Sequence, residues 1–238
     1  MNLGSIAERV AQLDWSAIYE ALCLQGFATT GPLLSQQECD EIAQNYEHEE
    51  LFRSRVVMAR HGFGQGEYQY FSYPLPGLIE QLRVAFYAKL APQANAWHQT
   101  MGVESRFPES LQEMLARCHE AGQQRPTPLL LKYVAGDYNC LHQDLYGEQV
   151  FPIQATFLLS KPGVDFEGGE FVMVEQRPRM QSKPSVIPLL QGEAVLFAVH
   201  HRPVQGTRGI YRVNMRHGVS VVRSGFRFTS GLIFHDAT

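Results

Sequence analysis

The sequence lacks the features that mark exported and membrane-spanning proteins. Its 238 residues contain no run of 18 apolar residues, and the first fifteen, MNLGSIAERVAQLDW, lack the uninterrupted apolar core of a signal peptide. The four cysteines are scattered, with no CxxC pair and no spacing typical of a disulfide framework, which fits reduced thiols in a cytosolic protein. We therefore expect a soluble, cytoplasmic protein that is not exported and has no membrane partner.

Internal repeats, low-complexity segments and a strong net charge are also lacking. The apolar fraction of 45% and the charged fraction of 18% are ordinary for a globular protein with a substantial core. A net charge of −4 argues against a generally basic nucleic-acid binder. Acidic residues are absent between Ala194 and His235, however, and six arginines occur there: Arg202, Arg208, Arg212, Arg216, Arg223 and Arg227. We expect this region to accommodate an anionic group.

Residues 1–125 are predicted to be mainly helical. Apolar residues at helical spacing indicate helices at 6–13, 15–24, 76–102 and 108–121. The capping box Ser35-Gln-Gln-Glu38 indicates a further helix that runs to about Tyr46, and residues 26–30 indicate a short strand.

A glycine-punctuated hairpin near residues 55–73 interrupts these helices. Its first strand is expected to include Val56 to Ala59, and its second presents Tyr68 and Tyr70. The hairpin either packs its aromatic side chains on the main sheet or forms a flexible lid over a substrate.

From residue 126 onward the pattern changes to short strands broken by Gly and Pro. Strands are expected at 129–134, 139–143, 152–159, 169–175, 185–188, 194–199, 209–215, 217–222 and 226–234. Many short strands at this spacing predict a sandwich or barrel, and here a jelly roll (a double-stranded β-helix) with an open mouth between two sheets. The predicted fold is therefore α+β: one domain over residues 1–238, in which a helical region (1–125) packs on a jelly-roll core (126–238).

The triplet His142-Gln143-Asp144 carries the most chemical information. Residues two apart on a strand point to the same face, so His142 and Asp144 can bind one ion together. With a second imidazole they form a ligand set that suits non-haem Fe(II) and leaves coordination positions open. A chain with nine His and six Asp contains a chance His-x-Asp about one time in four, so a simple His–Asp hydrogen bond is the alternative. Cys140 shares this strand parity, as a soft ligand or, more simply, as a small buried hydrophobe.

Three downstream histidines could supply the second imidazole. His200 and His201 are adjacent and point to opposite faces of a strand, so at most one of them could bind. His217 is followed ten residues later by Arg227, whose guanidinium matches the geometry of a carboxylate. A 2-oxo acid that chelates iron through its keto and carboxylate oxygens would need such a cation if its far end carried a second carboxylate.

This order of elements resembles the Fe(II)/2-oxoglutarate-dependent oxygenase superfamily. The resemblance covers most of residues 129–238, including Gly136-Asp137-Tyr138, Gly168-Gly169-Glu170-Phe171 and Gly192-Glu-Ala-Val-Leu-Phe197. It implies that His142, Asp144 and His217 bind Fe(II) and that Arg227 binds the distal carboxylate of 2-oxoglutarate, with Tyr133 as a second contact. It also implies O2 as the oxidant, with ascorbate as a reductant.

A narrower resemblance rests on the blocks LHQDLYGE, FPIQATFLLS, EGGEFVMVEQRPRMQS, RHGVS and GLIFHDA. They are similar to a bacterial family of nucleic-acid oxygenases that is compared with the AlkB alkylation-repair dioxygenases. Two positions depart from AlkB: Leu131 stands where AlkB has Asn, and Arg223 and Arg227 are four apart instead of six. The resemblance implies hydroxylation or oxidative demethylation of a substrate, with release of succinate and CO2, and alkylated nucleic acid is one candidate substrate.

Residues around the mouth would then recognise this substrate. Tyr68, Tyr70 or Tyr146 could stack a base, and four arginines could steer a phosphate backbone: Arg177, Arg179, Arg202 and Arg208. Solvated charge or a structural ion pair is the alternative for each arginine. Two other functions also stay open, a hydroxylase of a small metabolite, amino acid or peptide, and a non-catalytic, cupin-like metal-binding protein. No obligate protein partner is evident.

Overall fold

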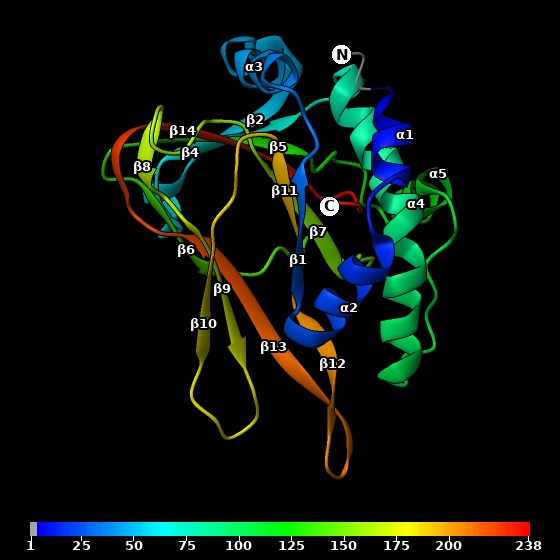
Figure 1. Cartoon of the computed structure of the whole chain (residues 1–238). Helices are drawn as coiled ribbons and strands as arrows, with labels where there is room; N and C mark the ends of the chain where they lie inside the picture. The colour runs from blue at the N-terminus through cyan, green and yellow to red at the C-terminus, as the bar shows by residue number, and fades with distance from the viewer. Residues whose placement is uncertain (1–3) are drawn as a thin grey trace.

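Two antiparallel sheets form the body of the fold, and most of the helices gather along one side of it (Figure 1). The structure is a computed structural model and describes residues 4–238. The larger sheet has eight strands in the order β1–β11–β7–β14–β5–β4–β2, with β8 paired to β14. The smaller sheet has six strands in the order β10–β9–β13–β6–β3, with β12 paired to β13.

The strands lie mainly in the second half of the chain. The larger sheet contains β1 (Phe27–Pro32), β2 (Phe52–Val57), β4 (Glu67–Phe71), β5 (Leu129–Val134), β7 (Ile153–Leu158), β8 (Phe166–Gly168), β11 (Glu193–Ala198) and β14 (Val222–Leu232). The smaller sheet contains β3 (Gly64–Gln65), β6 (Tyr138–His142), β9 (Phe171–Gln176), β10 (Lys183–Ile187), β12 (His201–Gly206) and β13 (Gly209–Val219).

The helices lie in the first half of the chain, as predicted. They are α1 (Ile6–Ala11), α2 (Trp15–Gln25), α3 (Gln36–Gln44), α4 (Gly77–Thr100) and α5 (Leu111–Glu120), with 3-10 turns at Asn45–Glu47, Glu49–Leu51 and Met58–His61. None of the helices within residues 4–238 combines the length and apolar character needed to cross a membrane.

Helix α4 packs on the larger sheet through an apolar stripe. Ile79, Leu82 and Phe86 are fully buried, which confirms that the stripe is core. The Phe86 ring meets Phe157 of β7 edge-on with 5.7 Å between centroids, so the helix fixes the strand from behind. Because side chains alternate along β7, its other face is free to line the space between the sheets.

The strands differ from the expected ones in several places, and the short strands β3 and β8 were not expected. A single strand, β13, replaces the two expected at 209–215 and 217–222, because β9 pairs continuously with Asn214 to Val219 across the proposed break. Strand β12 was not expected; it contains Pro203, which is tolerated because β12 pairs only with β13. Met58 and Ala59 belong to a 3-10 turn, where a strand was predicted.

The hairpin near residues 55–73 extends the larger sheet. Its second strand, β4, pairs with β5 from Glu67 to Tyr70, and its first, β2, pairs with β4. The strand that carries these aromatic side chains is therefore fixed in the sheet by backbone hydrogen bonds, which agrees with the alternative in which the hairpin packs on the main sheet.

The predicted capping box at Ser35 is present and is tied to α1 by an ion pair. Arg9 contacts both carboxylate oxygens of Glu38, at 2.5 and 2.9 Å, and both side chains are largely buried. The hydrogen bonds from Arg9 are the main reason that the pKa of Glu38 falls to about 2, against the desolvation that would raise it. The pair joins α1 to α3.

We expect Arg9→Ala to lower the free energy of unfolding at pH 7 by about 1.5–3 kcal/mol. Because the pKa of Glu38 is lower in the folded state, its stabilisation is complete above about pH 4.5 and is lost as the pH falls toward 2. The loss caused by Arg9→Ala should therefore shrink over that range in urea unfolding. Arg55→Ala, which breaks the more exposed pair with Glu67, is the control and should cost about 0–1 kcal/mol. An Arg9→Ala loss that is equal at both ends of the range would contradict the assignment.

Candidate metal centre and active-site pocket

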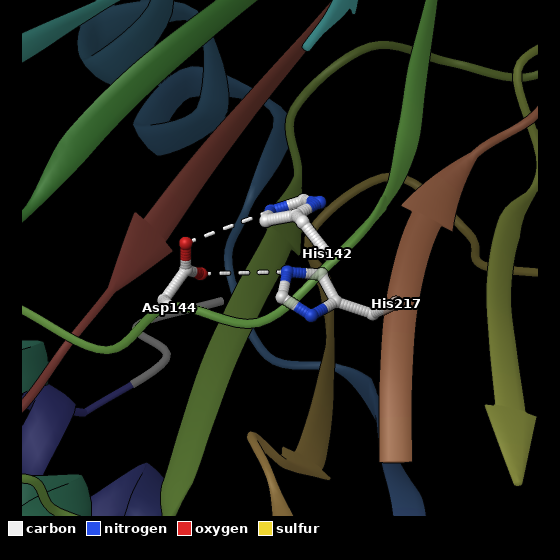
Figure 2. Close-up of side chains that lie close together, drawn as sticks. All are labelled: His142, Asp144 and His217. Atoms are coloured by element: carbon white, nitrogen blue, oxygen red, sulfur yellow. Dashed lines mark ion pairs between the residues drawn. The ribbon is translucent and has the colours of Figure 1, made fainter. Parts of the chain in front are cut away.

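Backbone pairing between β6 and β13 brings two histidines together. His142 is the last residue of β6 and lies opposite His217 of β13, and their ring centroids are 4.2 Å apart. Just beyond β6, Asp144 turns its carboxylate toward both rings: Oδ1 lies 3.6 Å from Nε2 of His142, and Oδ2 lies 3.4 Å from Nε2 of His217 (Figure 2). One ligand atom from each residue fits within 4.8 Å of the others, which is compact enough for a single metal ion.

The tautomer of His142 suits metal binding, and aromatic packing holds the ring of His217. Nδ1 of His142 lies 2.7 Å from the carbonyl oxygen of Cys140, so it carries the proton and Nε2 keeps its lone pair. His217 is packed between Phe171, stacked at 5.8 Å, and Phe197, at 4.6 Å. Burial is the main cause of the lowered pKa of His217, which keeps this imidazole neutral as a metal ligand must be.

The carboxyl of Asp144 is ionised despite its burial. Desolvation alone would raise its pKa, but the hydrogen bond from His217 and the charges of the two histidines outweigh that effect and hold the pKa below its usual range. Two imidazoles and one carboxylate therefore face one point. The donor set fits Fe(II), which such ligands bind in proteins.

A buried arginine without a hydrogen-bond partner lies in the same pocket. Arg227 is opposite Tyr133 in the β14–β5 ladder, with its guanidinium carbon 5.6 Å from the centre of the Tyr133 ring. It is 1% exposed, and within residues 4–238 its Nε and Nη1 have no partner. Burial lowers its pKa to about 10, so it remains charged at neutral pH. An unpaired buried cation is costly, and an anion would compensate for it.

Gly169 makes room for this arginine. A Cβ atom at Gly169 would lie 2.9 Å from Cδ of Arg227, and the φ angle of 61° favours glycine. The Gly-Gly turn singled out in the sequence therefore packs its backbone against the cation.

The pocket between the sheets has a volume of about 290 Å³. Within the described chain, its lining contains the carboxylate of Asp144, the guanidinium of Arg227 and the imidazoles of His142 and His217, and the rest of the lining is aromatic, aliphatic or neutral polar. Tyr68, Tyr70, Tyr133 and Tyr146 all lie on its wall, as predicted from the sequence, together with Phe63 from the hairpin turn.

Several lining residues were missed from the sequence. Gln154 and Thr156 of β7 and Thr229 of β14 face the pocket, and Nε2 of the buried Gln154 has no hydrogen-bond partner in the described chain. Alternation along residues 153–158 of the block FPIQATFLLS, in which Gln154 and Thr156 are the polar members, was the signal that could have identified two of them.

Tyr70 and Tyr146 form a hydrogen-bonded chain that ends at Asp144, one of the candidate metal ligands. The hydroxyl of Tyr70 donates to that of Tyr146 at 3.0 Å, and Tyr146 donates to Oδ1 of Asp144 at 2.6 Å. Burial and the Asp144 charge raise the pKa of Tyr146 well above its usual value, so its hydroxyl stays protonated.

The arginines expected to steer a phosphate backbone lie outside the pocket. Arg202 is 1% exposed and is bonded to Glu175 and to the carbonyls of Cys23 and Leu24, so the phosphate prediction is wrong for it and the structural ion pair is present. Arg177 pairs with the same Glu175 at 2.6 Å. Arg179 and Arg208 are exposed in the β9–β10 and β12–β13 turns.

Cys140 and the two adjacent histidines are likewise outside the cluster. Cys140 is exposed and lines the pocket, so its interpretation as a buried hydrophobe is wrong, and its thiol does not belong to the three-residue group. His200 and His201, whose rings lie 3.5 Å apart at the start of β12, do not reach it either.

Two arginines with equal burial and different partners give a stability test. We expect Arg227→Met to leave the free energy of unfolding unchanged or to raise it by about 1–4 kcal/mol, because it removes an unpaired buried charge. Arg202→Met, the matched control, should lower it by about 3–5 kcal/mol because Glu175 loses a buried partner. Urea unfolding at neutral pH measures both, and a strongly destabilised Arg227→Met would show that the arginine has a structural partner.

With this geometry established, the chain was compared with known proteins. Uncharacterized proteins of Mycobacterium tuberculosis are 51% identical to it over 167 residues, which is 70% of this chain and 72% of theirs. A Pseudomonas putida prolyl-4-hydroxylase aligns with 94% of this chain and 99% of its own, at 13% identity and a TM-score of 0.55. A Trichoplax adhaerens prolyl hydroxylase in complex with a hypoxia inducible factor peptide aligns with 94% and 89%, at 14% identity and a TM-score of 0.57.

At identities this low the solved structures show the fold alone, and they confirm the predicted jelly-roll core with its N-terminal helices. Residues 66–237, most of the chain, match the model of the family Oxygenase-NA, described as an oxygenase catalysing oxidative methylation of damaged DNA. This match confirms the resemblance to nucleic-acid oxygenases, and the chain belongs to the Oxygenase-NA family.

Proposed function

We propose that this protein is an Fe(II)- and 2-oxoglutarate-dependent dioxygenase in which His142, Asp144 and His217 hold the iron. The observation that carries the proposal is the convergence of this triad with the unpaired Arg227 in one pocket. A structural metal site would have no use for a buried, uncompensated cation beside it, whereas a dicarboxylate co-substrate requires one. A non-catalytic, cupin-like role does not explain Arg227.

Each residue has a defined task in this proposal. The triad would supply three ligands to the iron, and a ligand set of this kind leaves coordination positions for the co-substrate and O2. Arg227 binds the distal carboxylate of 2-oxoglutarate, and Tyr133, opposite it in the ladder, donates a second hydrogen bond. When bound, iron and 2-oxoglutarate activate O2 so that a substrate C–H bond is hydroxylated while succinate and CO2 are released. The aromatic walls exclude water and orient the substrate.

Alkylated nucleic acid is the substrate that we propose, and two observations support it. The family description names damaged DNA, and the wall between the mouth and the triad is neutral and aromatic, which suits a flat base. Hydroxylation of an N-methyl group would release it as formaldehyde, so the overall result is demethylation. The exposed Arg179 and Arg208, on hairpins that project together from the smaller sheet (Figure 1), would contact phosphates outside the pocket.

The chemistry can be tested without any prime substrate. Protein supplied with Fe(II), 2-oxoglutarate and ascorbate should form succinate slowly, and His217→Ala should abolish this turnover because the triad loses a ligand. His200→Ala and His201→Ala are matched controls and should retain it, since neither ring reaches the cluster. Succinate measured by mass spectrometry decides the assignment, which fails if either control variant loses turnover while His217→Ala keeps it.

The substrate class needs a separate comparison. Methylated single-stranded oligonucleotides should stimulate succinate formation and yield formaldehyde, whereas a panel of amino acids, peptides and small metabolites should not. Binding of the oligonucleotide should weaken steeply with salt, and the double variant Arg179→Gln/Arg208→Gln should reduce the slope of log affinity against log salt by about 0.7 for each phosphate that it no longer neutralises on a single strand. A flat salt response, or stimulation by a metabolite or peptide instead, would favour a small-molecule or peptide hydroxylase.

A further inference from the structure

Asp144 lies in a part of the chain that no sheet holds in place. Strand β6 ends at His142, and residues 143–146 belong to no helix or strand. Gln143 is anchored by its side chain, whose Nε2 donates to the carbonyl of Met215 at 2.7 Å. The backbone of Asp144 has no comparable anchor from a strand ladder, so the orientation of its carboxylate depends on contacts made by the side chain itself.

The strongest such contact comes from Tyr146. Its hydroxyl donates to Oδ1 of Asp144 at 2.6 Å, the distance of a strong, charge-assisted hydrogen bond from a hydroxyl to a carboxylate. The oxygen that it occupies is the one nearer His142, while Oδ2 faces His217. With Oδ1 engaged by a hydroxyl, Asp144 is disposed to offer an ion one oxygen instead of two.

A second tyrosine fixes the first. Tyr70, on β4, donates to the hydroxyl of Tyr146 at 3.0 Å, and the two rings meet edge-on at 6.2 Å. Tyr70 is held in the larger sheet by its pairing with Leu129 and carries the Arg53 guanidinium over its ring at 4.5 Å. A hydroxyl that accepts one hydrogen bond donates a stronger one, so the two bonds support each other.

We propose that Tyr70 and Tyr146 are positioning residues that orient Asp144 as a metal ligand, so that the hairpin strand β4 is coupled to the metal centre. This inference rests on the proposed iron site and assigns both tyrosines a role other than base stacking. Outer hydrogen bonds to ligating carboxylates tune metal affinity, and their loss typically costs ten- to a hundred-fold.

Phenylalanine substitutions separate the two roles. Tyr146→Phe keeps the ring, and with it any stacking on a substrate, but removes the hydroxyl that binds Asp144. We expect it to weaken Mn(II) binding, measured by equilibrium dialysis, by about ten- to a hundred-fold. Tyr70→Phe should weaken binding less, because it acts through Tyr146. Tyr87→Phe is the matched control: it removes a hydroxyl that bonds only the carbonyl of Pro108, and it should leave Mn(II) affinity unchanged.

The double variant tests whether the two tyrosines act in series. If Tyr70 acts through the Tyr146 hydroxyl, Tyr70→Phe should have no further effect once Tyr146 is already Phe, and the two losses should be non-additive. Additive losses would overturn the coupling between the residues. Wild-type affinity in Tyr146→Phe would overturn the whole inference, and circular dichroism confirms that each variant is folded.

A reference variant keeps this test distinct from that of the proposed function. His217→Ala should lose Mn(II) binding entirely. If the wild type binds no better than His217→Ala, the metal site and the proposed dioxygenase fail together. If the wild type binds well and the tyrosine variants bind equally well, the iron site stands and the positioning role alone is rejected.

Discussion

The register between β6 and β13 is the constraint on which the site depends. Because side chains alternate along a strand, a slip of one residue would turn either histidine out of the pocket. His142 and His217 face each other because β13 is a long strand, held on both sides by partners: β12 pairs with its first half, and β9 and β6 with its second. Strand β13, which was predicted as two separate strands, therefore supplies the rigidity that a metal site needs.

The two most buried arginines of the C-terminal half, Arg202 and Arg227, differ in the partners of their guanidinium groups. Arg202 lies in the space between α2 and the smaller sheet, and its bonds to Glu175 and two carbonyls make it part of the scaffold. Arg227 instead lines the active-site pocket, and its Nε and Nη1 have no hydrogen-bond partner in the described chain, so its charge is available to a ligand. The sequence shows both as arginines in a stretch without carboxylates, and only the fold distinguishes a structural cation from a functional one.

Much of the site could be predicted because its chemistry depends on local spacing. The choice of His217 over His200 and His201 rested on the resemblance to the oxygenase superfamily, whereas His142 and Asp144 were paired because they are two apart in the sequence, although Asp144 lies beyond the end of β6. The capping box at Ser35 and the apolar stripe of α4 were predictable for the same reason. Contacts between residues far apart in the sequence could not be predicted. Nothing near Arg202 in the sequence points to Glu175, and nothing near Tyr146 points to Tyr70.

Gly169 links the size of the pocket to a turn that contains no catalytic group. The turn lies against the aliphatic part of Arg227, so its backbone fixes how far the guanidinium is set back from the triad. In the proposed function, the position of the guanidinium would set the length of the diacid that can reach from the cation to the metal. In that proposal, co-substrate selectivity would depend on the β8–β9 turn as well as on the strand that carries the arginine, and a side chain at position 169 would displace the guanidinium while leaving every polar contact residue in place.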